Sequence, residues 1–560
     1  MGASVPERLP REVGTPLPLS PLVPPETYTY DYIIVGGGTA GCVLASRLSE
    51  DPGVSVLVIE QGPVSNTWAS RVPLISGNIY DKSNLSTKLW SQPLRHVDNR
   101  YLEVIYGQAL GGTTRVNGML YTRGCPGDYN QWKALGNDGW GYEDLEPYFA
   151  KSEKSHSHPE SAFRGKKGVW ENRNFAESPY KIIDYVDRAM HKSGVPRIED
   201  ANAPDVPAAH TALLDVIQDS GYRRHSAFLA FLPPKLTICP NSVVCRDGVR
   251  ATGVHFETLN SRKADFRYVA KARREVIVCA GAIGSPQVLM LSGLGPNAHL
   301  EEKGVAVVVD LPAVGSHLSD HMGVPVAVEV PIEDSLHILE VSPVKAVLEL
   351  LKYLTVGGGS LARPFQNISS FFPSRLVGPE HTIATAPAAA LDATVPANRP
   401  DIELMHLTNN CADIDTDGIG VFTLMVTLIR PRSEGTVRLA TANPRARPDV
   451  DLNYLADPAD YEPVRRGVRF ALRVLDDVRA QGYPVKRDLQ VPPDGGKDDA
   501  SLDAVVDTAL RVHGVQGLRV CDASVFPEII GSHTMAPTVA VAEKCADLVK
   551  AAWPRHWMCS

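Results

Sequence analysis

The sequence predicts an α/β fold in which a discontinuous Rossmann-type domain is joined to a second lobe of α+β type. Residues 30–62 read as strand, glycine-rich turn, helix and strand, the βαβ unit from which Rossmann domains are built. Short apolar runs typical of buried strands recur at 275–280 and 518–522. The chain has 560 residues, more than one hydrophobic core usually organises. We therefore expect strands of one sheet near both ends of the chain, with the residues between them forming the second lobe.

Composition and charge argue against several classes of protein. Hydrophobic residues make up 44% of the chain and charged residues 21%, the balance of a globular protein rather than a disordered one. The net charge of −8 argues against nucleic acid as a partner, because a nucleic-acid-binding protein usually carries a basic face. The longest apolar runs are shorter than the roughly 18 residues that a bilayer requires, so we expect no transmembrane segment.

The N-terminus and the cysteines indicate where the protein resides. The first 27 residues are rich in proline and lack the apolar stretch of a secretory signal peptide, which predicts a disordered arm or an extended strap. The nine cysteines are few, and Cys42, Cys279, Cys521 and Cys545 lie in apolar runs, as buried free thiols do. No pair has the spacing of a zinc site, so no metal is expected. These features favour a cytoplasmic location.

Gly36, Gly38 and Gly41 form a G-x-G-x-x-G pattern directly after a strand and before a helix. The first glycine permits a tight turn, the second lets the backbone approach a pyrophosphate, and the third lets helix and strand pack closely. Glu60 lies 19 residues beyond Gly41, at the end of the next strand, and suits a hydrogen bond to an adenosine ribose hydroxyl. Its carboxylate would repel the extra phosphate of NADP. The pattern indicates a dinucleotide site but does not separate FAD from NAD.

Longer motifs separate the two dinucleotides. Residues 106–119 and 281–295 resemble the two signatures of the glucose–methanol–choline (GMC) oxidoreductases, and 512–538 resembles the C-terminal flavin segment of that family. The resemblance extends over about 30–552. It implies an FAD-binding Rossmann-type domain with a substrate-binding second lobe. It also implies an enzyme that oxidises a small alcohol to an aldehyde or ketone by hydride transfer to flavin N5, with O2 or a quinone as electron acceptor.

The resemblance also implies how the chain is divided. The expected regions are a proline-rich arm at 1–27, an N-terminal FAD-binding region at 28–322, a substrate lobe at 323–427 and a C-terminal region at 428–553. An insertion at about 145–235 is expected to belong to the substrate lobe, as are the C-terminal residues up to about 500. Periodicity within the second lobe predicts helices over 343–354 and 461–480 and a strand over 421–427.

The family's FAD contacts map onto specific positions of this sequence. Those expected at the ADP half are Thr39, Ala40, Glu60 and, through its main chain, Val244. Those expected at the pyrophosphate, ribityl chain and flavin ring are Trp90, Thr113, Asn117, Gly118, Met119, Leu120, Asp522, Ala523, Thr534, Met535 and Thr538.

His533 is the residue expected to be catalytic. Alcohol oxidation by a flavin needs a base for the hydroxyl proton, and histidine suits this role because its ordinary pKa of about 6.5 lies near working pH. In the family the site is a pair, His with His or His with Asn, and one member lies in the loop before the last helix, where this chain has His533. His321 and His513 are expected to make structural hydrogen bonds instead.

The other member of the catalytic pair is missing. The family places it in a stretch resembling His-x-x-(Gly/Ser)-Thr-Cys-Arg-Met, but this chain has no histidine between Arg479 and Val512. Residues 501–507 join the preceding helix directly to the residues that follow the motif. A skipped or miscalled exon, a degenerate copy and a family member with altered chemistry all remain open. Two alternative functions follow: a non-redox flavoprotein of secondary metabolism, such as a lyase or cyclase, and an impaired protein that binds FAD poorly.

Overall fold

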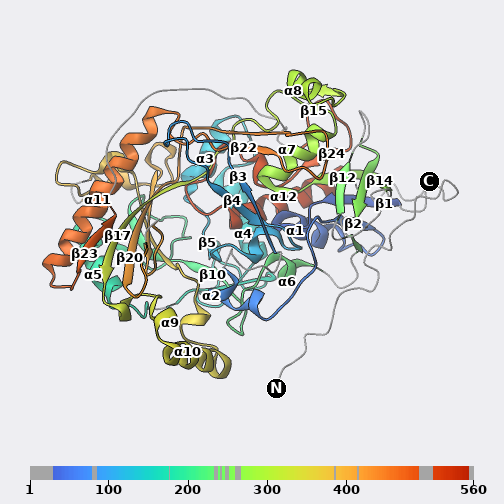
Figure 1. Cartoon of the computed structure of the whole chain (residues 1–560). Helices are drawn as coiled ribbons and strands as arrows, with labels where there is room; N and C mark the ends of the chain where they lie inside the picture. Colours follow the sequence, from blue (N-terminus) through green and yellow to red (C-terminus); the bar gives the residue numbers. More distant parts are fainter. Residues whose placement is uncertain are drawn as a thin grey trace.

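Two seven-stranded sheets organise the chain (Figure 1). The computed structural model describes residues 29–77, 85–175, 177–232, 237–239, 242–245, 251–258, 267–383, 386–412, 415–490 and 509–553. The proline-rich arm and the join at 501–507 lie outside these residues. Within the described part of the chain, no helix is both long and apolar enough to cross a membrane.

The first sheet has the parallel centre expected of a Rossmann-type domain. Its strand order is β11-β2-β1-β14-β13-β12, and β24 also pairs with β14. Its strands are β1 (Thr29–Val35), β2 (Val56–Ile59), β11 (Thr237–Cys239), β12 (Ser242–Cys245), β13 (Gly253–Thr258), β14 (Arg267–Val278) and β24 (Leu518–Val520). The pairs β11–β2, β2–β1, β1–β14 and β14–β24 are parallel, and β12–β13–β14 is antiparallel. Strands from both ends of the chain therefore meet in one sheet, as expected.

Alternation along β1 shows why this strand is a continuous apolar run. Tyr32 and Ile34 pack into the core that α1 and α12 share, whereas Ile33 and Val35 pack into the core on the opposite face, beside α7. A strand covered on both faces must be apolar at every position. The covering helices are α1 (Thr39–Leu48), α7 (Gly281–Leu291) and α12 (Met535–Ala552).

The second sheet forms the other lobe and is mostly antiparallel. Its strands, in spatial order, are β23 (Arg487–Gln490), β17 (Met322–Val330), β20 (Gly420–Leu428), β19 (Ile402–Leu407), β18 (Ile368–Phe372), β9 (His210–Leu213) and β8 (Arg197–Ile198). The helices α5 (Lys181–Lys192) and α11 (Tyr461–Ala480) share a hydrophobic core with it. The helix expected over 461–480 and the strand expected over 421–427 are both present as α11 and β20.

The segment at 145–235, expected wholly in the second lobe, divides between the two. Its α5, β8 and β9 belong to the second lobe. In contrast, Trp170 and Val216 lie in the core that α1 and α12 share, because the small sheet β5-β10-β7-β6 packs on that side. The strands of this small sheet are β5 (Leu120–Tyr121), β6 (Glu153–Ser155), β7 (Trp170–Arg173) and β10 (Asp215–Ile217).

Candidate functional site

A cleft of about 800 Å³ opens at the carboxyl ends of the parallel strands of the first sheet. Gly36, Glu60, Ala280 and Asp522, which closely follow β1, β2, β14 and β24, line it. The second lobe contributes Gln366 to the lining. Open α/β sheets bind ligands in this position, outside the carboxyl ends of the strands. The volume lies within the range of about 300–1,000 Å³ that is typical of ligand sites.

The glycine turn after β1 forms the floor of the cleft, and its geometry requires glycine. Gly36 has a φ of +104°, and a Cβ there would lie 2.4 Å from the Cys279 carbonyl oxygen. A Cβ on Gly41 would lie 2.0 Å from the Gly36 carbonyl oxygen. Gly38 lines the cleft at the start of α1, where the amide groups of a helix N-terminus favour an anion such as phosphate. The turn therefore suits the close approach of a pyrophosphate.

Glu60 is held by the backbone around it. Its two carboxylate oxygens accept hydrogen bonds from the amides of Gly37 (2.8 Å) and Gly62 (2.7 Å). Burial raises the pKa of Glu60, and these amide hydrogen bonds only partly oppose the rise. Each oxygen keeps a further lone pair. Glu60 can therefore accept a hydrogen bond from a hydroxyl in the cleft without losing its fixed position.

Asp522 ties the end of β24 to the start of α7. Its carboxylate accepts hydrogen bonds from the Gly281 amide (2.9 Å) and the Ser285 hydroxyl (2.5 Å) on one oxygen, and from the Ser524 amide (2.9 Å) on the other. The side chain is buried. This residue therefore fixes the cleft wall that it shares with Ala523.

Arg224 lies behind the cleft wall and is fully buried. Its guanidinium donates to the side-chain oxygen of Asn117 (2.9 Å) and to its main-chain oxygen (2.6 Å), and also to Thr114 O and Ser76 Oγ. Neither Arg224 nor the buried Arg115 forms an ion pair with a carboxylate among the residues that the structure describes. Burial, with a contribution from the Arg115 charge, lowers the pKa of Arg224 to about 9. The two cations give the wall a positive potential that suits an anionic ligand.

Replacing Arg224 with methionine should destabilise the protein and disorder Asn117. The substitution leaves buried oxygens without a donor, and one such oxygen costs about 1–3 kcal/mol. Urea unfolding should therefore show a free energy of unfolding lower by at least that amount. Arg224→Lys should recover it only in part, because an ammonium group lacks the planar fork that reaches both oxygens of Asn117. Arg375→Met, at an exposed arginine, is the matched control, and equal unfolding curves for the Arg224 and Arg375 variants would refute this role.

The loop that carries His533 is fixed on several sides. Asp128 accepts a hydrogen bond from the Gly531 amide (3.2 Å). Thr122 Oγ1 accepts hydrogen bonds from the Ser532 hydroxyl (2.5 Å) and the His533 amide (3.3 Å). His321 Nε2 donates to the main-chain oxygen of Ile530, the residue before Gly531 (3.2 Å). The imidazole of His533 is therefore presented to the cleft by a loop with little freedom.

His533 is paired with a carboxylate from the second lobe. Its Nε2 lies 3.2 Å from Oε1 of Glu403, a fully buried residue of β19. The same oxygen accepts a hydrogen bond from the Ser369 hydroxyl of β18 (2.7 Å). Burial lowers the pKa of His533, but the charge and hydrogen bond of Glu403 outweigh burial, so the pKa is raised. Burial raises the pKa of Glu403, but His533 and Ser369 outweigh that effect, so the carboxyl stays ionised.

Glu403 is a site residue that the sequence analysis missed. The signal that could have found it is an acidic residue inside an otherwise buried strand, Ile402–Leu407. A buried carboxylate is costly unless it is paired, so its presence there indicates a nearby partner. Nothing in the local pattern names that partner, because His533 lies 130 residues further along the chain.

Most of the residues expected from the sequence come together at the cleft. Those that line it are Gly36, Gly38, Thr39, Ala40, Glu60, Thr113, Asn117, Gly118, Leu120, Asp522, Ala523, His533, Thr534, Met535 and Thr538. Val244 of β12 pairs with Phe256 of β13, and its main-chain contact with the ADP half stays a prediction. Three others do not line the cleft. Gly41 is packed beneath the turn, and Met119 is fully buried with a φ of +67°. Trp90 is 63% exposed at the end of β3 (Ser86–Trp90).

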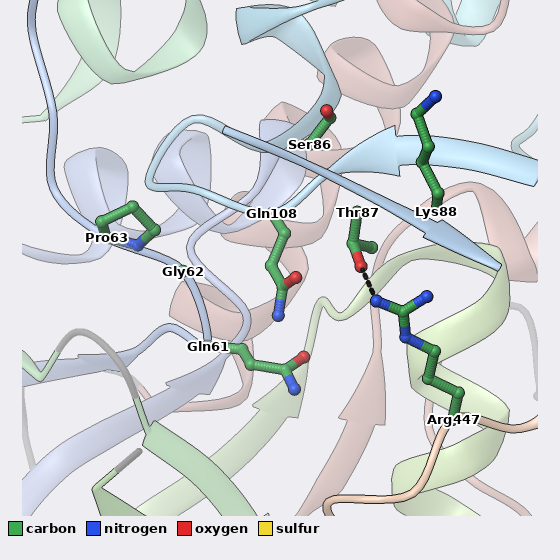
Figure 2. Close-up of a pocket in the computed structure, with 8 residues that line it drawn as sticks. All are labelled: Gln61, Gly62, Pro63, Ser86, Thr87, Lys88, Gln108 and Arg447. Atoms are coloured by element: carbon green, nitrogen blue, oxygen red, sulfur yellow. Dashed lines mark hydrogen bonds between the residues drawn. The ribbon is translucent and has the colours of Figure 1, made fainter. Parts of the chain in front are cut away.

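A second cavity of about 400 Å³ adjoins the cleft at the Glu60 end (Figure 2). Gln61, Thr87, Gln108 and Arg447 line both spaces. Arg447 donates a hydrogen bond to Thr87 Oγ1 (3.1 Å), and Figure 2 shows its guanidinium turned toward the same space as the amides of Gln61 and Gln108. These polar groups line the space shared by the cavity and the cleft, which no sequence motif indicated.

One cluster elsewhere offers ligand atoms of the kind that metals bind. His158, Asp200 and Asp215 lie close together. Arg164 already pairs with both aspartates, and its Nη2 lies 2.7 Å from Asp215 Oδ2. Arginine supplies the positive charge there, so the cluster is a partly buried ion-pair network.

Similarity to known proteins extends over both lobes. The GMC oxidoreductase family model matches residues 30–323 with its N-terminal part and 431–542 with its C-terminal part. The alcohol dehydrogenase (acceptor) of Pseudomonas putida is 30% identical over 93% of this chain and 95% of its own. The oxygen-dependent choline dehydrogenase of Burkholderia multivorans is 31% identical over 94% of each chain. A solved structure of Aspergillus oryzae formate oxidase covers 94% of this chain and 99% of its own, with a TM-score of 0.82 and 25% identity.

Proposed function

The chain belongs to the GMC oxidoreductase family, and from this premise we propose that His533 is the base of its FAD-dependent oxidation of a small alcohol. The family expected from the sequence signatures is confirmed, and the chain is an FAD-dependent alcohol oxidoreductase. The observation that carries the proposal for His533 is its hydrogen bond to the buried carboxylate of Glu403 beside the cleft.

The cleft fits FAD on its own geometry. The glycine turn leaves room for a pyrophosphate, Glu60 keeps lone pairs for a ribose hydroxyl, and buried cations stand behind the wall. We place the ADP half along Gly36, Gly38 and Glu60 and the flavin half near Asn117 and Thr534. The further contacts that we propose are Thr39, Ala40, Thr113, Gly118, Leu120, Asp522, Ala523, Met535 and Thr538. When bound, FAD supplies the hydride acceptor for the carbon that carries the hydroxyl.

The protein's own contribution is to take the hydroxyl proton. An ionised carboxylate only accepts hydrogen bonds, so Nε2 of His533 carries the proton that faces Glu403. This leaves Nδ1 with a free lone pair as the ring nitrogen that accepts the substrate proton. The Glu403 charge then stabilises the imidazolium that forms. We propose that His533 and Glu403 take the role of the catalytic pair in this chain, which lacks the family's usual second histidine.

Anaerobic mixing with a panel of primary and secondary alcohols, choline among them, tests this function. At least one alcohol should remove the absorbance of the oxidised flavin. If no alcohol reduces a fully loaded flavin, the proposed reaction is wrong. Turnover that leaves the flavin oxidised would support a lyase or cyclase, and purified protein without FAD would support an impaired copy. The dehydrogenase and oxidase relatives favour alcohol oxidation over both alternatives.

The electron acceptor and the location of the protein are further proposals. We propose O2 or a quinone as acceptor, because the relatives include both an acceptor-dependent and an oxygen-dependent enzyme. Oxygen consumption, compared with reduction of a soluble quinone, would distinguish them. The cytoplasmic location stays a prediction from the sequence.

Replacing Glu403 with glutamine should shift the pH dependence of kcat/KM to lower pH. His533 works as a base only when it is deprotonated, so activity rises as pH increases through its pKa. The Glu403 charge raises that pKa, and removing the charge lowers it. The acid limb of the pH profile should therefore move down. Glu329→Gln, in the same sheet but paired with Lys486 and Arg487, should leave the limb in place, and an unmoved limb in the Glu403 variant would disprove the coupling.

A further inference from the structure

The helix α10 (Pro343–Val356) presents an apolar face to solvent. Its most exposed large side chains include Val344, Val347, Leu348, Leu351 and Leu354, which are between 51% and 71% exposed. At 100° per residue these five positions fall on one side of the helix, and we refer to them as the α10 strip. Figure 1 shows α9 (Ile338–Val341) and α10 projecting from the body of the protein.

The opposite side of α10 attaches the helix to the protein. Tyr353 is buried in a small core with Val72 and Leu361. The side chain of Glu349 turns inward and accepts a hydrogen bond from the Ser360 amide (2.6 Å). The helix is also well terminated, because Ser342 caps its start and Gly357 adopts a φ of +67° at its end. The α10 strip is therefore the outer face of a fixed helix rather than a poorly packed core.

The exposed charges of α10 are positive. Lys345 and Lys352 lie on one flank of the strip and are exposed, whereas the acidic residue of the helix, Glu349, is only 12% exposed at its side chain and lies 3.9 Å from the Lys352 ammonium. An exposed apolar face with flanking lysines is typical of helices that lie in a membrane interface. The two exposed lysines of α10 contrast with the net charge of −8 of the whole chain.

A second copy of the chain is a poorer occupant of the strip. A helix of 14 residues is about 21 Å long and about 10 Å wide, which offers a face of roughly 200 Å². A stable protein interface buries about 800 Å² on each partner. A membrane requires no matching protein surface and attracts the lysine flank through anionic headgroups. We propose that the α10 strip docks this enzyme on an anionic membrane surface.

Docking at α10 would also bring the cleft close to lipid. The chain runs from α10 through Gly357–Gly359 and the turn at Ser360–Ala362 to Phe365 and Gln366, which line the cleft. An apolar alcohol or a quinone dissolved in the membrane would then lie near the cleft wall. This consequence rests on the proposed function, whereas the docking itself does not.

Flotation of the full-length protein with lipid vesicles tests the proposal. The protein should float with vesicles of phosphatidylcholine and phosphatidylglycerol and bind pure phosphatidylcholine more weakly. Leu348→Ser with Leu351→Ser should weaken binding at least about tenfold, because two exposed leucines no longer enter the lipid. Lys345→Gln and Lys352→Gln should each weaken binding to the anionic vesicles about fivefold. The matched control is Leu135→Ser with Val395→Ser, two exposed apolar residues outside α10, and it should bind like the unaltered protein.

Several outcomes would overturn the proposal. The unaltered protein could fail to float with either vesicle, or the α10 double variant could float as well as the control variant. A concentration-dependent dimer without lipid, abolished by the α10 double variant, would assign the strip to a second copy. Circular dichroism and flavin reduction by a water-soluble alcohol should be the same in all variants. If an alcohol does not reduce the flavin of the unaltered protein, that result would count against the proposed reaction and not against docking.

Discussion

Replacing His533 with asparagine should slow flavin reduction by an alcohol by about 10²–10⁴-fold, the usual contribution of a positioned general base. Asparagine can still donate a hydrogen bond to Glu403, so the loop should keep its place, but its amide cannot take up the hydroxyl proton. Because this proton moves only as the substrate reacts, kcat and kcat/KM should fall together. Anaerobic stopped-flow measurement of flavin reduction gives the rate directly.

The matched control for this variant is His513→Asn. His513 is exposed, so its replacement should leave the rate of flavin reduction unchanged. Both variants should retain bound FAD in equal amounts, which absorbance of the purified proteins will show. A His533 variant that holds FAD and is reduced at the rate of the unaltered protein would rule out this histidine as the base.

Replacing Gly41 with alanine should lower both the free energy of unfolding and the amount of bound FAD. A Cβ at this position would lie 2.0 Å from the Gly36 carbonyl oxygen, so α1 must move away from the turn. Overpacking a tight site costs about 1–3 kcal/mol. The same shift displaces Gly38 and the amides at the start of α1 from the cleft. We expect a lower free energy of unfolding in urea and a purified protein that is largely colourless.

Gly378→Ala is the control for this second variant. A Cβ on Gly378 would meet Thr382 O at 3.6 Å, an ordinary van der Waals distance. Its alanine variant should therefore keep its stability and its flavin. Full FAD occupancy in the Gly41 variant, measured as the ratio of flavin to protein absorbance, would show that the turn does not form the pyrophosphate site.

The features that local sequence specified well are those carried by short stretches of backbone. The apolar run of β1, the glycine turn and Glu60 at the end of β2 together indicated a Rossmann-type unit, because each depends on periodicity or on steric demands within a few residues. Likewise α11 begins and ends where the apolar spacing predicted. Long signatures then identified FAD, since they name several cleft residues at once.

Features that depend on contact between distant segments could not be predicted from local sequence. Trp90 lies on an exposed hairpin end instead of at the cleft, and the segment at 145–235 divides between two cores. The sequence also could not predict that the apolar side of α10 is exposed to solvent. The same pattern of apolar residues is equally typical of a helix packed against a core. Burial is a property of what surrounds a helix, and the helix sequence alone does not contain it.

By itself, the sequence determined the fold class, the family, the cofactor and the histidine expected at the site. The tertiary structure alone decided what surrounds that histidine: Glu403 from β19 and, behind the cleft wall, Arg224 against Asn117. Glu403 and His533 are 130 residues apart, and Arg224 and Asn117 are 107 apart. Periodicity and motifs report the conformation and burial of a few neighbouring residues. The packing of sheets and helices decides which charged groups come into contact across such separations. Those contacts in turn shift the pKa values at the site.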